Sequence, residues 1–166
     1  MHFPKSFVNL LLLTTLITSA SVVYGQDTEY IGSQKKLSHE VGVRYGAVTG
    51  TGLSYGMWYK RVGFEVSVLP YYEKNSSDLI VGGALFTILK ESEYVNLLGF
   101  AGVSFTETRS YAYYNSVWNT GLGFGVQVFL FDVLSFQLLT GFGVYDAFDR
   151  PRTNIIGEAG VYYKLQ

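Results

Sequence analysis

Large apolar residues alternate with small or polar ones along the stretch from Trp118 to Tyr145, the most regular part of the chain. In its first half, one parity carries bulky apolar side chains and the other carries mostly glycine, amide and small polar residues. After a short break at Asp132, the same alternation returns from Leu134 onward. Because successive side chains of a strand point to opposite faces, this period of two predicts a β-hairpin.

The second face of this hairpin lacks the charged residues that a water-exposed sheet carries. If Leu130 lies opposite Leu134, glycines pair across the two strands and form a narrow groove, made of Gly121, Gly123, Gly141 and Gly143. Bulky apolar side chains on one face and small ones on the other are typical of a closed barrel in lipid. We therefore expect the apolar face to contact lipid and the glycine groove to line the lumen.

Similar alternation along the rest of the chain predicts eight strands. They are expected near residues 37–46, 52–60, 64–72, 79–89, 94–106, 118–130, 134–145 and 155–165. A Thr-Gly turn follows the first strand, and the facing of the fourth and fifth strands stays open. Connections after strands two, four and six are short, whereas those after three, five and seven are longer, with the longest at 108–116. The predicted fold is an all-β, eight-stranded antiparallel up-and-down transmembrane barrel with periplasmic turns and outer loops.

The N-terminus has the pattern of a secretory signal peptide, expected to be cleaved. Lys5 precedes an uncharged run from Phe7 to Ala20, and small residues then occur at Ala20 and Gly25. Cleavage after Ala20 and cleavage after Gly25 both fit the pattern. We expect residues 1–25 to be the signal peptide, 26–36 a polar periplasmic leader and 37–166 the barrel domain.

Composition narrows the function classes. The chain has no cysteine and a formal net charge of −1, which excludes a disulfide framework and thiolate metal sites and gives no indication of nucleic acid as a partner. The one histidine after the predicted signal peptide, His39, cannot be combined with a serine and a carboxylate into a catalytic set. We therefore expect neither an enzyme nor a bound metal or other cofactor.

From Leu37 to Gln166 the pattern of strands and connections resembles the small outer-membrane β-barrel proteins. This group includes the transmembrane domain of outer membrane protein A, the X-type and opacity-type barrels and the W-type channels. The resemblance rests on pattern and covers no diagnostic motif. It implies a place in the outer membrane of a Gram-negative cell, with membrane lipid as a partner and a monomeric state. Family members usually end on an aromatic residue, whereas this chain ends Tyr163-Lys164-Leu165-Gln166.

Six charged residues have the parity of the predicted lumen, namely Glu40, Arg44, Lys60, Glu65, Glu158 and Lys164. Registers estimated from the turns predict three pairs, which are Lys60 with Glu65, Arg44 with Glu158 and Glu40 with Lys164. Because a buried charge without a partner is costly, we interpret the set as structural ion pairs that plug the lumen. A gated ion or proton path is the alternative interpretation.

Three function classes remain. The preferred one is a non-enzymatic membrane protein whose loops contact the exterior or whose barrel braces the envelope; its contact candidates are Tyr111, Tyr113 and Tyr114. The second is a narrow channel for small or apolar solutes along the glycine groove. The third is a soluble, exported lipid-binding barrel with the reverse facing. The sequence names neither an extracellular ligand nor an envelope partner.

Overall fold

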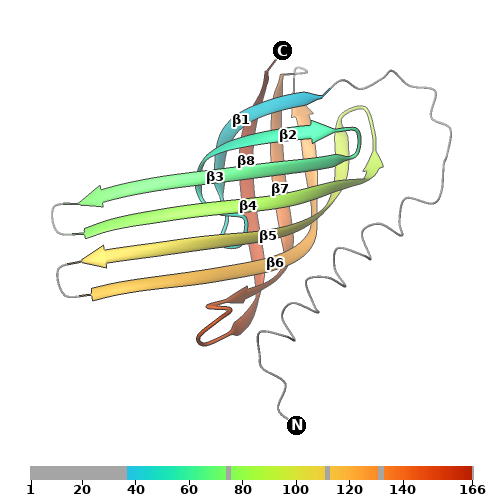
Figure 1. The fold of residues 1–166 in the computed structure, drawn as a ribbon. Coiled ribbons are helices and arrows are strands. Elements are labelled where there is room, and N and C mark those ends of the chain that lie inside the picture. Colours follow the sequence, from blue (N-terminus) through green and yellow to red (C-terminus); the bar gives the residue numbers. More distant parts are fainter. Residues whose placement is uncertain (1–36, 74–75, 111–112, 131–132, 166) are drawn as a thin grey trace, which may run out of the picture. The chain divides into compact units, whose positions relative to one another are not determined.

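A computed structural model describes residues 37–73, 76–110, 113–130 and 133–165. Within them, eight antiparallel strands follow one another in chain order, and β8 pairs with β1 to close a barrel (Figure 1). The strands are β1 (Ser38–Tyr45), β2 (Gly52–Tyr59), β3 (Val62–Glu73), β4 (Ser76–Glu91), β5 (Val95–Ser110), β6 (Tyr113–Leu130), β7 (Leu134–Tyr145) and β8 (Arg152–Leu165). The predicted eight-stranded barrel is confirmed. The predicted signal peptide, the leader and Tyr111 lie outside the described residues.

In the described part of the chain, no helix has the length and apolar character needed to cross a membrane.

The predicted hairpin has the predicted register. Leu130 lies opposite Leu134, Gly121 opposite Gly143, and Gly123 opposite Gly141. The structure also assigns the facing of β4 and β5 that the sequence left open, since Phe86 and Leu98 are buried inside whereas Leu85 is exposed. Both strands therefore contribute large apolar side chains to the interior as well as to the outer wall.

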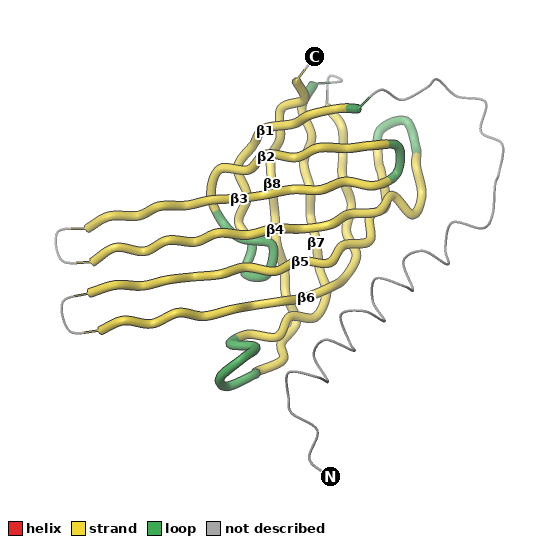
Figure 2. Tube along the Cα trace, in the orientation of Figure 1, coloured by secondary structure: helices red, strands yellow, loops and turns green. Residues whose placement is uncertain are grey.

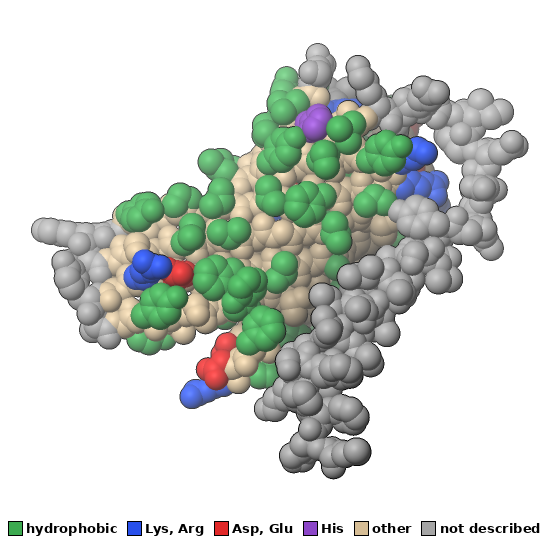
Figure 3. Space-filling model, viewed as in Figure 1, with side chains coloured by type: hydrophobic (Ala, Val, Ile, Leu, Met, Phe, Trp, Pro, Cys, Tyr) green, Lys and Arg blue, Asp and Glu red, His purple; other side chains and the backbone are tan. Residues whose placement is uncertain are grey.

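The outer wall of the barrel is apolar. Leu53, Phe124, Leu138 and Phe142 are each between 59% and 68% exposed, and Figure 3 shows apolar side chains spread over the wall on the side in view. An exposed apolar surface of this extent is far beyond what a protein monomer shows to water. The soluble lipid-binding barrel with reversed facing is therefore wrong.

An aromatic stack fills one side of the interior. The ring centroids of Trp58 and Phe86 lie 5.7 Å apart, and those of Phe86 and Phe100 lie 6.3 Å apart. These rings belong to one buried apolar cluster with Val48, Ala84, Ile88, Leu98, Leu139 and Ile156. The lumen is thus partly a hydrophobic core, which the sequence pattern alone did not indicate.

Four strands continue beyond the barrel as a sheet. The β2–β3 ladder ends at Leu53 and Val68 and the β6–β7 ladder ends at Thr120 and Val144, but β3, β4, β5 and β6 pair onward to their tips. We call residues 69–73, 76–80, 106–110 and 113–117 the projecting sheet; Figures 1 and 2 show it extending to one side. The expected loop at 108–116 is therefore wrong. Its Thr and Tyr residues are polar enough to resemble a loop, yet they favour strands.

The β1–β2 connection is not a tight turn. Residues 46–51, which we call the plug loop, fold into the lumen, where Val48 and Thr49 have exposures of 0% and 1%. Gly50 and Gly52 adopt positive φ angles of 90° and 125°, which residues with a Cβ rarely adopt. The predicted Thr-Gly turn is thus replaced by a segment that occupies the outer mouth of the barrel.

Candidate functional site

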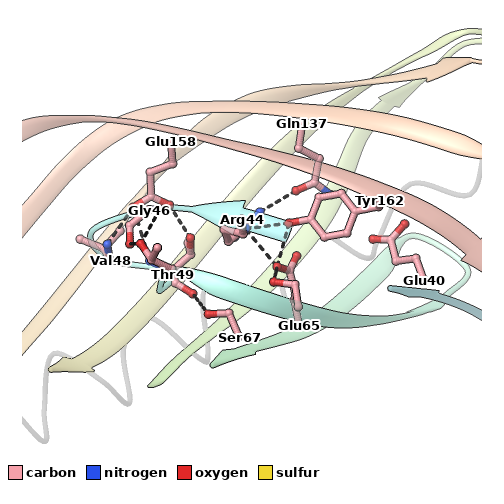
Figure 4. A network of polar contacts seen from close by, with 12 residues as sticks. Glu40, Arg44, Gly46, Val48, Thr49, Glu65, Ser67, Gln137, Glu158 and Tyr162 are labelled. Atoms are coloured by element: carbon pink, nitrogen blue, oxygen red, sulfur yellow. Dashed lines mark hydrogen bonds and ion pairs between the residues drawn. The ribbon is translucent and has the colours of Figure 1, made fainter. Parts of the chain in front are cut away.

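Glu158 of β8 anchors the plug loop. Its Oε1 accepts hydrogen bonds from the backbone N–H groups of Val48 (2.7 Å) and Thr49 (3.4 Å), and its Oε2 accepts a short one from the Thr49 hydroxyl (Figure 4). Glu158 is itself buried. Three hydrogen bonds from the loop meet at this one carboxyl group, so Glu158 is the main polar anchor of the loop.

Small polar side chains on three other strands hold the carbonyl groups of the plug loop. Ser67 donates to the Thr49 carbonyl at 3.0 Å. Ser104 and Asn119 both donate to the Ala47 carbonyl, at 2.5 and 3.2 Å. Because a buried backbone group without a partner is costly, these side chains allow the loop to lie inside the barrel.

Glycines of the barrel wall leave the space that the loop fills. A Cβ atom on Gly121 would lie 3.0 Å from Val48 Cγ2, and one on Gly143 would lie 3.0 Å from Val48 Cγ1. A Cβ on Gly123 would instead lie 2.6 Å from Gly141 Cα and 2.9 Å from the Phe100 ring. The predicted glycine groove therefore faces the lumen, where Val48 and Phe100 pack against it.

A second polar cluster lies deeper in the lumen, around Arg44. Its Nε atom lies 3.0 Å from Glu65 Oε1 and donates to the Tyr162 hydroxyl at 2.7 Å (Figure 4). Tyr162 in turn donates to Glu65 at 2.8 Å, and Gln137 accepts from Arg44 Nη2 at 2.6 Å. Ser54 donates to the same Glu65 oxygen at 2.8 Å. The two side chains of the ion pair are 1% and 2% exposed, so they are removed from water.

The predicted pair of Arg44 with Glu158 is wrong. Arg44 lies opposite Gly160, which places Glu158 two residues closer to the outer mouth. There the plug loop takes up the carboxylate, and Arg44 turns to Glu65 instead. The register of β1 and β8 is as predicted, but no local pattern indicated that a loop inside the barrel would bind Glu158.

The predicted pair of Lys60 with Glu65 is also wrong. Tyr59 pairs with Val62, so Lys60 sits in the tight turn with a φ of 53° and is exposed. Glu65 lies opposite Gly56. The β2–β3 turn is two residues shorter than expected. This difference shifts the register of β2 against β3 and places Lys60 in the turn, outside the lumen.

Glu40 lies opposite Lys164, which is the predicted register. The Lys164 side chain is exposed, however, and buried Glu40 accepts a hydrogen bond from Trp58 Nε1 at 2.7 Å. Of the six charged residues assigned to the lumen, four are buried, namely Glu40, Arg44, Glu65 and Glu158. Lys60 and Lys164 are exposed at the end of the barrel that holds the β2–β3 turn and the end of β8.

These clusters bind parts of the barrel to one another. His39 Nδ1 lies 2.6 Å from the Tyr55 hydroxyl, away from both clusters. In the part of the chain that the structure describes, no three His, Cys, Asp or Glu side chains are grouped in a way that could hold a metal ion.

The projecting sheet offers a different kind of surface. Tyr113 and Tyr114 are 59% and 62% exposed and, as neighbours on β6, point to opposite faces of the sheet. The guanidinium of Arg109 lies 5.8 Å from the centre of the Tyr114 ring and also pairs with Glu107. Within the described residues, no strand pairs with the far side of β6 at 113–117. This edge is available for hydrogen bonding.

Sequence reasoning missed the plug loop and the role of Glu158 in holding it. One signal was present, because the segment Gly46-Ala47-Val48-Thr49-Gly50-Thr51 carries no charge although it connects two strands at a mouth of the barrel. Loops in water are usually polar or charged, so an uncharged connection of this length indicates burial.

Comparison with known proteins supports the fold. No protein-family model matches the sequence, and no curated protein sequence matches it. Among solved structures, the chain is similar to the N-terminal β-barrel domain of Pseudomonas aeruginosa OprF, with a TM-score of 0.55 and 10% identity over 78% of this chain and 96% of that one. It also matches Neisserial surface protein A, with a TM-score of 0.49 and 11% identity over 78% and 96% of the two chains. Ail of Yersinia pestis matches with a TM-score of 0.45 and 15% identity over 78% and 97%.

At these identities the comparisons establish the fold alone, and the match to the OprF domain carries that conclusion. The predicted resemblance is confirmed at this level. The chain therefore has the fold and the apolar outer wall of a small outer-membrane β-barrel protein.

Proposed function

We propose that this chain is a non-enzymatic integral protein of the outer membrane that uses its projecting sheet to contact a partner outside the cell. The observation that carries the proposal is the length of β4, β5 and β6, each of 16 to 18 residues. About 9 to 11 tilted residues suffice to cross a bilayer. The remainder of each strand therefore stands outside the membrane as ordered sheet.

The two edges of the projecting sheet differ. The β3 edge carries Pro70, which has no N–H group to donate. The β6 edge at 113–117 contains no proline and carries the exposed side chains of Tyr113 and Tyr114. An unpaired strand edge is a template for an added strand, and clustered tyrosines are frequent in contact surfaces. These features favour an extended peptide segment as the partner.

The filled lumen makes a channel the weaker hypothesis. Arg44, Glu65, Gln137 and Tyr162 are buried at one level, and the aromatic stack of Trp58, Phe86 and Phe100 lies beside them. An eight-stranded barrel has an interior just wide enough for side chains, and here large ones occupy it. This packing supports a contact role for the protein more than a transport role.

A peptide library displayed on phage and selected against the protein in lipid nanodiscs tests this proposal. We expect extended, alternating sequences to be enriched, because an edge strand binds main-chain groups and places alternate side chains on two faces. Binding should be lost when both hairpins are shortened so that residues 70–79 and 107–116 are replaced by tight turns.

The matched control is Phe148→Ala in the β7–β8 connection, which changes an exposed aromatic side chain outside the projecting sheet. This variant should keep the binding of the whole chain. Enrichment no greater than on empty nanodiscs, or binding that survives the shortening of both hairpins, would contradict the proposal.

A further inference from the structure

The plug loop touches every strand from β3 to β8. Its carbonyl groups are held by Ser67 of β3, Ser104 of β5 and Asn119 of β6. A Cβ atom on Gly82 of β4 or on Gly143 of β7 would collide with it or crowd it, and Glu158 of β8 binds its N–H groups. These hydrogen bonds are made by side chains and none of them belongs to a strand ladder, so withdrawal of the loop would leave the ladders unbroken.

Glu158 is the one group in this contact set that carries a charge. The two ion pairs found among the described residues, Arg44 with Glu65 and Arg109 with Glu107, do not include it. Its hydrogen bonds come from two N–H groups and one hydroxyl of the plug loop. The seated position of the loop and the burial of this carboxylate consequently depend on each other.

Glycines flank the buried centre of the loop. Gly46 precedes it, and Gly50 and Gly52 follow it with positive φ angles. Glycine adopts many backbone conformations at low cost, so these positions are suited to act as hinges. Rotation of the backbone at these glycines is the movement by which the loop would leave the lumen.

We propose that the plug loop is a gate with a seated and a released position, and that Glu158 holds it seated. Release opens a chamber at the outer mouth, lined by Ser67, Ser104, Asn119 and Glu158. The chamber is blind, because the Arg44 cluster and the aromatic stack close the lumen beneath it. Release changes access from outside without producing a channel, and it is independent of any contact made by the projecting sheet.

Cysteine labelling tests the gate cleanly, because the natural sequence has no cysteine. Val48→Cys places a thiol on the buried loop, and Tyr114→Cys places one on the exposed sheet as the reference. The reagent is a charged, water-soluble maleimide added to protein in lipid vesicles. With the loop seated, we expect the thiol at position 48 to react at least about 100-fold more slowly than the one at 114.

Two variants should release the loop by different routes. Glu158→Ala removes the anchor of the loop. Gly102→Ala introduces a Cβ atom 2.8 Å from Thr49 Cγ2 and 2.9 Å from the Val48 carbonyl oxygen, so the new methyl group collides only with the loop. In each, labelling at position 48 should rise to within about tenfold of the reference rate. Gly157→Ala is the matched control, because its Cβ would have no atom within 4 Å.

Heat-modifiable gel mobility verifies that each variant is folded before it is labelled. Four results would overturn the proposal: fast labelling at position 48 in the otherwise unchanged chain, no acceleration in the two release variants, equal acceleration in Gly157→Ala, or failure of both release variants to fold. Ion conductance through planar bilayers should stay at the level of the unchanged chain in every variant. Conductance steps in the release variants would show that the chamber is not blind and would favour the channel.

Discussion

Replacing Glu65 by leucine is expected to destabilise the barrel by about 3 to 5 kcal/mol. The change strands the Arg44 guanidinium in the lumen, where its Nε atom lies 3.0 Å from the lost carboxylate. It also removes the acceptor of the Tyr162 and Ser54 hydroxyl groups. Arg44→Met should cost a similar amount, because it leaves the Glu65 carboxylate buried without its charge partner.

The double variant Arg44→Met with Glu65→Leu should be more stable than either single variant, since no unpaired charge remains in it. Urea unfolding in lipid vesicles measures all three free energies. Arg109→Met is the control, because the Arg109 side chain is 66% exposed in its pair with Glu107 and this pair should contribute less than about 1 kcal/mol. Additive losses in the double variant would show that the side chains of Arg44 and Glu65 do not interact.

Leu138→Arg should cost about 2 to 4 kcal/mol of stability in a bilayer. Leu138 is 59% exposed on the outer wall near the centre of β7, where it pairs with Val126 and Ala159 of the neighbouring strands. A charge at this height would face hydrocarbon without a partner, so unfolding in vesicles should occur at lower urea.

Tyr72→Arg is the matched control for this arginine. Tyr72 is 80% exposed in the projecting sheet, beyond the end of the β2–β3 ladder, and the proposed function places this sheet outside the membrane. Its substitution should change stability by no more than about 0.5 kcal/mol. Equal losses at positions 72 and 138 would contradict the assigned membrane boundary, and no loss at 138 would contradict lipid contact at this wall.

The strands with clear alternation, such as β6 and β7, could be predicted from the sequence together with their facing, because both follow from a local period of two. For example, Gly121 is small and Leu122 is bulky and apolar. This local difference alone assigns Gly121 to the inner face and Leu122 to the outer face, without knowledge of any distant contact. The facing of β4 and β5 could not be predicted, because large apolar residues occur on both faces of these strands. Residues 107–110 and 113–117 of the projecting sheet were missed because most of them are polar, as in a loop, while pairing between β4, β5 and β6 keeps them extended.

The contents of the lumen could be predicted only in part. Charged residues of inward parity were found, and Glu40, Arg44, Glu65 and Glu158 are buried. The partners of these charged residues depend on the strand register and on the plug loop. A change of two residues in the length of the β2–β3 turn is enough to give Glu65 a different neighbour. Gly121 and Gly143 leave space for Val48, which comes from a distant segment of the chain. A local sequence pattern carries no information about such a contact.

The barrel is expected to fold only in lipid, with its apolar wall in contact with the bilayer and its polar groups inside. The most direct measurement compares refolding of the chain without its predicted signal peptide in plain buffer and in lipid vesicles, followed by gel mobility before and after boiling. We predict no folded species in buffer, and in vesicles a compact band whose mobility changes on boiling. A monodisperse, fully folded protein in plain buffer would contradict the account.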